Sequence, residues 1–179
     1  GDLRSIALAC EVLGEIEAAD GQEAEAQRAW EQGVAAYREV GSWLGIASIR
    51  SLQGRLAAAR GDIVAARAFY LECLARTRGQ GGYRLMDVLE GLALLAAAQG
   101  EYARAVRLAG ASAARQRAGF GYITSDDATR FERALSEARQ ALGTTAAAAA
   151  WAEGQALTLD EAFDLAVAVA SEEPAGTGV

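Results

Sequence analysis

Histidine and lysine are both absent from the 179-residue chain, so all 17 of its basic residues are arginines. Without histidine the chain lacks the most common general base and the most common metal ligand, and no Ser–His or Cys–His catalytic pair can form. Without lysine it cannot contain a glycine-rich phosphate loop of the lysine-bearing type. We therefore expect no enzymatic activity, no metal site and no cofactor.

Proline and cysteine are also scarce. The one proline is Pro174, and a long stretch without proline or β-branched runs indicates helix almost throughout. Cys10 and Cys73 are too few for a metal site, and we expect them to be buried free thiols in a reducing cytoplasm. No run of about 18 strongly apolar residues and no signal segment appears, so a membrane span is not expected. Because the chain begins with Gly1 and not with methionine, we interpret it as a piece of a longer protein.

A repeat of about 40 residues organises what is present. Gly21, Gly61 and Gly100 stand 40 and 39 residues apart, each between two helical patterns. An alanine follows each glycine by five positions, and a small residue precedes it by seven: Gly14, Gly54 and Ala93. The position nine residues after each glycine holds Trp30, Tyr70 and Ala109 in turn. A period of this length carried by helix pairs is typical of an α-solenoid.

The periodicity of apolar residues predicts nine helices. The first helix is expected over residues 3–19, and one of its faces carries Ile6, Cys10, Leu13 and either Ile16 or Glu17. The others are expected at 22–39, 43–60, 62–78, 83–99, 101–118, 125–142 and 144–155, followed by one that a capping box at Thr158 starts. We predict an all-α, right-handed solenoid of antiparallel helix pairs with a C-terminal capping helix. Residues 1–120 would hold three hairpins, 121–171 a degenerate pair plus the capping helix, and 172–179 a disordered tail or linker.

The repeat resembles the tetratricopeptide repeat in a stretched form. Two sets carry the resemblance best, Gly14-Gly21-Ala26-Trp30 and Gly54-Gly61-Ala66-Tyr70. The repeats here are about six residues longer than the usual period of about 34, and they lack the terminal proline and the tryptophan of the first helix.

Three later segments resemble the end of the helical-repeat region of bacterial LuxR-type and MalT-like ATP-dependent regulators and related multidomain signalling ATPases. They are residues 107–112, 131–135 and 150–163. In LuxR-type members a DNA-binding domain follows after a polar linker, and residues 172–174 would be that linker. The resemblance implies a cytoplasmic regulatory domain joined to flanking domains.

The tetratricopeptide resemblance also implies a candidate groove, because the first helix of each pair lines the concave face in that family. The residues expected there, suited to a peptide, a protein partner or a small polar effector, are Glu11, Glu15, Ser48, Ser51, Arg55, Asp87 and Glu90. Charge is uneven, with net −6 in residues 1–40, which hold nine acids and three arginines. Residues 41–120 carry net +6 and residues 121–179 net −7. The positive charge of residues 41–120 has two explanations. It could attract an anionic ligand, or it could result from arginines that stand in the last turns of helices, where a cation is favourable.

We interpret the chain as a non-catalytic regulatory or sensor domain of a bacterial transcriptional regulator, which binds an effector or a protein partner. The alternative is a passive protein–protein scaffold or self-association module of a multidomain ATPase, which would form a homodimer. The acidic pairs Glu11/Glu15 and Asp87/Glu90 would suit an enzyme, but solvated helix surface is the commoner use of such pairs. Nucleic acid is a poor partner for an acidic domain.

Overall fold

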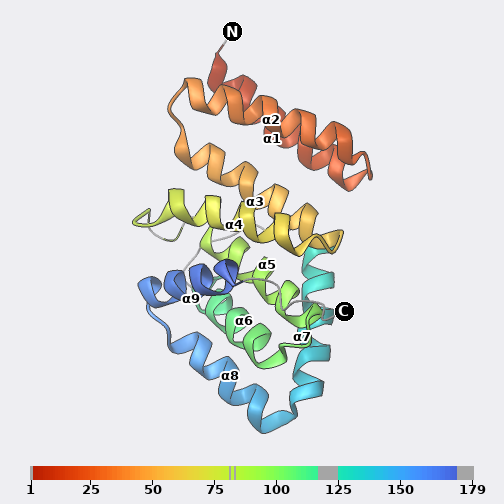
Figure 1. Ribbon diagram of the computed structural model, residues 1–179, viewed down its shortest axis with the longest axis vertical. Helices are drawn as coiled ribbons and strands as arrows, with labels where there is room; N and C mark the ends of the chain where they lie inside the picture. The colour runs from red at the N-terminus through yellow and green to blue at the C-terminus, as the bar shows by residue number, and fades with distance from the viewer. Residues whose placement is uncertain (1, 81, 83, 117–124, 173–179) are drawn as a thin grey trace. The chain divides into compact units, whose positions relative to one another are not determined.

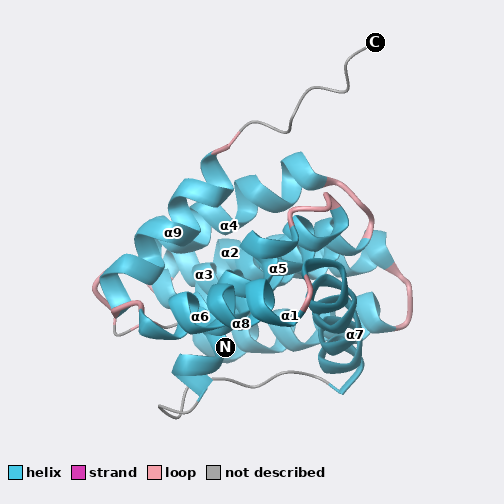
Figure 2. Ribbon diagram, turned by 90° about the horizontal axis from the view of Figure 1, so that it is seen from below, coloured by secondary structure: helices cyan, strands magenta, loops and turns pink. Residues whose placement is uncertain are grey.

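The computed structural model describes residues 2–80, 82, 84–116 and 125–172, and within these ranges it contains helices but no strand (Figures 1 and 2). The chain is therefore all-α over the described residues. The helices are α1 (Leu3–Ala19), α2 (Glu23–Glu39), α3 (Trp43–Ala59), α4 (Ile63–Thr77), α5 (Leu85–Ala98), α6 (Tyr102–Gln116), α7 (Ser125–Leu142), α8 (Thr144–Ala156) and α9 (Leu159–Ser171). Their bounds differ from the predicted ones by no more than two residues. The boundary expected at residue 120 and the tail from residue 173 onward lie outside the described residues.

The repeating glycines end helices in the left-handed conformation, as the sequence predicts. Gly21, Gly61 and Gly100 have φ between 76° and 77°. In each case the next residue's N–H donates to the carbonyl four residues before the glycine, as Asp62 does to Ala57 at 3.0 Å. This is the hydrogen-bond pattern of a Schellman cap. A side chain is strained at such a φ, which explains why glycine recurs at these turns.

The chain forms two compact units, unit 1 (Gly1–Thr77) and unit 2 (Arg78–Val179). In unit 1, α1 packs along α2 and α3 along α4, so that two hairpins lie in sequence order (Figure 1). Their shared core holds Trp30, Val34, Tyr37, Ile46 and Ile49. Within each hairpin the small residue before the turn packs on the aromatic residue after it. A Cβ on Gly14 would lie 2.3 Å from Trp30 Nε1, and one on Gly54 would lie 2.4 Å from Tyr70 Cε1.

Unit 2 contains the α5–α6 hairpin and three further helices. α7 packs on α5 and α6, and α9 contacts the same two helices. The most extensive contact of α8 is with α6, although α7 is its expected partner. Two glycines explain this contact: a Cβ on Gly154 would lie 2.0 Å from the carbonyl oxygen of Arg107, and one on Gly110 would lie 2.5 Å from that of Trp151. The α6 and α8 backbones thus approach each other closely at two glycines, one on each helix.

The start of α9 is fixed by hydrogen bonds from both directions. The side chain of Thr158 accepts from the Glu161 N–H, and the Glu161 carboxylate accepts from the Thr158 N–H at 2.8 Å. These bonds to Thr158 hold the pKa of Glu161 below its usual value. The Arg115 guanidinium also donates to the carbonyls of Leu157 (3.0 Å) and Thr158 (2.8 Å). It thereby ties α6 to the α8–α9 junction.

None of the helices in the described part of the chain has both the length and the hydropathy that crossing a bilayer requires.

Candidate functional site

Two of the predicted groove residues meet in the interior of unit 1. Glu11 of α1 is buried, and its carboxylate accepts hydrogen bonds from the Tyr37 hydroxyl at 2.8 Å and from the Ser48 hydroxyl. The Trp30 indole donates to the Glu11 carbonyl at 3.2 Å. Burying a carboxylate is costly unless hydrogen bonds satisfy it, and these donors come from α2 and α3. The Glu11 cluster therefore joins three helices.

The other predicted residues occupy varied settings. Glu15 is exposed, Arg55 is half-buried, and Ser51 is buried with a hydroxyl that has no hydrogen-bond partner among the described residues. In unit 2, Asp87 accepts from Arg84 at 3.0 Å, and buried Glu90 accepts from the Ser112 hydroxyl at 2.7 Å. Glu90 thus has a helix-joining contact like that of Glu11.

Sequence reasoning missed a second polar cluster, centred on Arg50 of α3. The Arg50 guanidinium is buried and lies 2.9 Å from Glu31 of α2 and 2.8 Å from Glu72 of α4, over the ring of Phe69. Burial raises the pKa of Glu31, but the hydrogen bonds from Gln53 and Arg50 outweigh this and leave it below its usual value. The two carboxylates outnumber the Arg50 guanidinium, and Glu72 also pairs with Arg76 at 2.9 Å. The cluster is therefore an internal cross-link with no excess positive charge for an anion. The spacing of these residues gives no sequence signal, because they come from three helices.

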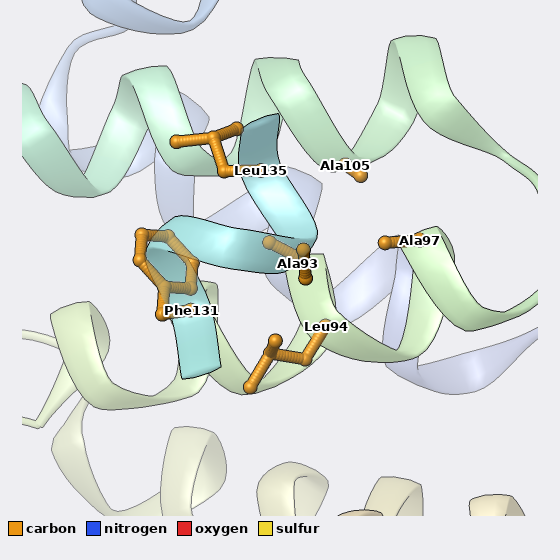
Figure 3. Close-up of a pocket in the computed structure, with 7 residues that line it drawn as sticks. Ala93, Leu94, Ala97, Ala105, Phe131 and Leu135 are labelled. Atoms are coloured by element: carbon orange, nitrogen blue, oxygen red, sulfur yellow. The ribbon is translucent and has the colours of Figure 1, made fainter. Parts of the chain in front are cut away.

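A small apolar hollow lies between α5, α6 and α7 (Figure 3). The space inside it is about 10 Å³, room for roughly one water molecule, and it is lined by Ala93, Leu94, Ala97, Ala105, Phe131, Ala134 and Leu135. Figure 3 shows Phe131 and Leu135 from α7 beside the alanines of α5 and α6. Ligand pockets are usually about 300–1,000 Å³ and carry a few polar groups that orient the ligand. This hollow has neither property, so it is a packing gap.

No group of three or more cysteine, aspartate or glutamate side chains among the described residues could hold a metal ion.

The most unusual surface of unit 1 is the apolar face of α1. The buried residues of α1 are Ala7, Glu11 and Gly14, whereas Ile6 is 46 % exposed, Leu13 48 % and Ile16 53 %. Six of the ten exposed large hydrophobic side chains in the described part of the chain belong to this one helix: Leu3, Ile6, Leu8, Val12, Leu13 and Ile16. Three residues of the predicted apolar face, Ile6, Leu13 and Ile16, thus do not pack on the rest of unit 1. Cys10, which we expected to be buried, is only half-buried and lies beside Gly33 of α2. Contiguous exposed apolar side chains of this kind mark interaction surfaces.

Acidic side chains surround this face. Asp2 and Asp20 flank the two ends of α1, and both are exposed. Glu17 lies one helical turn beyond Leu13 and is half-exposed, and Arg4 is the only basic residue of the helix. An apolar stripe with an acidic border is the arrangement that the structure offers for binding.

We compared the chain with protein-family models, with curated proteins and with solved structures, and it matches none of them.

Proposed function

We propose that this chain is a non-catalytic, helical-repeat interaction domain, and that it binds a protein partner through the exposed face of α1. The observation that carries the proposal is the exposure of Ile6, Leu13 and Ile16 on a helix whose opposite side is packed. Burying a fully exposed large apolar side chain gains about 1.5–3 kcal/mol, so a partner that covers these half-exposed side chains gains roughly half of that for each one. An exposed apolar surface of this kind can bind a protein partner without any catalytic group.

We further propose that the domain is a right-handed, tetratricopeptide-like solenoid closed by α9. The shared cap geometry of Gly21, Gly61 and Gly100 supports the repeat, and the Gly14–Trp30 and Gly54–Tyr70 contacts support its similarity from one hairpin to the next.

The regulatory part of the proposal rests on the three segments that resemble LuxR-type regulators. In such a regulator the domain would sense a partner in the cytoplasm and transmit its binding to flanking domains. The free thiols Cys10 and Cys73 support a reducing compartment.

A peptide-display selection against the purified chain tests the binding role. Helical peptides are selected on the wild type and counter-selected on Leu13→Asp, which alters an exposed position and should leave the fold intact. We expect enriched peptides that bind the wild type and lose affinity for the variant. If every enriched peptide binds both proteins equally, α1 is not the binding surface and the proposal fails.

A further inference from the structure

If the proposed binding role holds, the residues on the exposed face of α1 also indicate the chemical character of the partner. We infer that the partner is a cationic amphipathic helix that docks lengthwise along α1, with apolar residues in its centre and basic residues at both ends. The argument uses the shape of the stripe, the charges at its ends and the consequence of placing a second copy there.

The shape of the stripe suits a helix. Ile6, Ala9, Leu13 and Ile16 follow one another at steps of three, four and three residues, so they form a straight row on α1. At about 1.5 Å per residue the row is about 15 Å long. A second helix with apolar residues at similar steps can place its side chains between those of the row.

Acidic residues extend this row at both ends. Asp2 precedes Ile6 by four positions, and Asp20 follows Ile16 by four, so both aspartates continue the register of the stripe. Glu17 borders the row beside Leu13. The wider α1–α2 segment has the same sign, since residues 1–40 carry nine acids and three arginines. Basic side chains at the ends of a docked helix would therefore meet opposite charge at each end.

The same register argues against a second copy of the chain. In an antiparallel pair that matches Ile6 with Ile16 of the other copy, Asp2 of one copy faces Asp20 of the other. A parallel pair places like aspartates together as well. Apolar contact between two copies thus brings like charges together at both ends, which is unfavourable. The acidic border also disfavours nucleic acid and anionic lipid surfaces.

Three labelled 18-residue peptides that have leucine at the same positions test the inference. Their polar positions are all lysine, all glutamine or all glutamate, and fluorescence anisotropy gives their affinity for the full chain at about 50 mM and 500 mM salt. We expect the leucine/lysine peptide to bind best, with affinity that falls as salt rises. Leu13→Gln should weaken its binding about three- to tenfold, because the apolar contact of a half-exposed leucine is lost.

Two controls separate docking from general attraction. Val64 of α4 is 64 % exposed, so Val64→Gln removes an exposed apolar side chain outside the stripe and should leave binding unchanged. Asp2→Asn with Asp20→Asn removes the end charges, and asparagine remains a good N-cap. This double variant should reduce the preference for the lysine peptide over the glutamine peptide.

Each other outcome has a definite meaning. If the glutamine or glutamate peptide binds as well as the lysine peptide, and Leu13→Gln abolishes this, the cationic partner is wrong while the binding role of α1 stands. If no peptide binds, or if Leu13→Gln and wild type bind the lysine peptide equally, both proposals fail. If sedimentation shows a dimer that Leu13→Gln dissociates, the partner is a second copy and the inference is overturned.

Discussion

The contact between α6 and α8 makes a sharp prediction for Gly154→Ala. A Cβ at this position would lie 2.0 Å from the Arg107 carbonyl oxygen and 2.9 Å from the Ala111 nitrogen. A carbon–oxygen contact needs about 3.3 Å, so the two backbones must move apart by about 1 Å. Overpacking of this kind costs about 3 kcal/mol, and the better helix propensity of alanine returns about 1 kcal/mol. We expect a net loss of about 2 kcal/mol in the free energy of unfolding.

Thermal melting followed by circular dichroism at 222 nm measures this loss. In a chain of this size about 2 kcal/mol lowers Tm by roughly 4–8 °C. Ala152→Gly calibrates the propensity contribution, because Ala152 is exposed on the same helix. If Gly154→Ala instead melts higher than the wild type, helix propensity alone decides the outcome, and the close backbone contact does not exist.

Two further predictions concern polar contacts. Thr158→Val removes the side-chain cap of α9 and should cost about 1 kcal/mol. Carbon NMR titration should show the pKa of Glu161 rising only part of the way toward its usual value of 4.5, because the backbone N–H of residue 158 still donates to the carboxylate and only the side-chain hydrogen bond is lost. Because the folded pKa is the lower one, the stability that these bonds give is present above pH 4.5 and is lost as the pH falls through the folded pKa, so the two proteins should converge in acid. Ser48→Ala removes a donor to buried Glu11 and should cost about 1–3 kcal/mol in urea unfolding. Ser51→Ala should be nearly neutral, because its hydroxyl is equally buried on the same helix and finds no hydrogen-bond partner in the described part of the chain. Equal losses for the two serine variants would contradict the assignment.

The sequence predicted the features that depend on local chemistry. The helix ends follow from residues that act within a few positions of themselves, such as the left-handed glycines at 21, 61 and 100. The positions of Gly14 and Trp30 are also visible in sequence, because both stand at fixed distances from the turn between them, whereas their contact comes from the structure. These signals need no knowledge of the rest of the fold.

The packed side of α1 could not be predicted in this way. Both sides of the helix are apolar: one carries Ile6, Leu13 and Ile16, and the other carries small residues such as Ala7 and Gly14. Hydrophobicity alone favours burying the large residues. The structure buries the small ones, because Trp30 fits against the backbone at Gly14. Shape complementarity with a neighbouring helix decided the outcome, and it is a tertiary property.

The predicted site residues show the same limit. Periodicity placed Glu11 and Ser48 on separate helices, but their hydrogen bond depends on how α1 and α3 meet. Arg50 and its two carboxylates come from α3, α2 and α4, and no spacing in the chain relates them. Chemistry that depends on several helices at once therefore has to be read from the structure.

The pairing of helices within each unit also bears on how fast each unit folds. In unit 1 the extensive contacts join helices that are consecutive in the chain, α1 with α2 and α3 with α4. In unit 2 the most extensive contact joins α6 with α8, so the whole of α7 must be accommodated before that contact forms. Contacts between distant segments close larger loops and slow folding. In stopped-flow refolding we expect Trp30, in unit 1, to reach its native environment before Trp151, in unit 2.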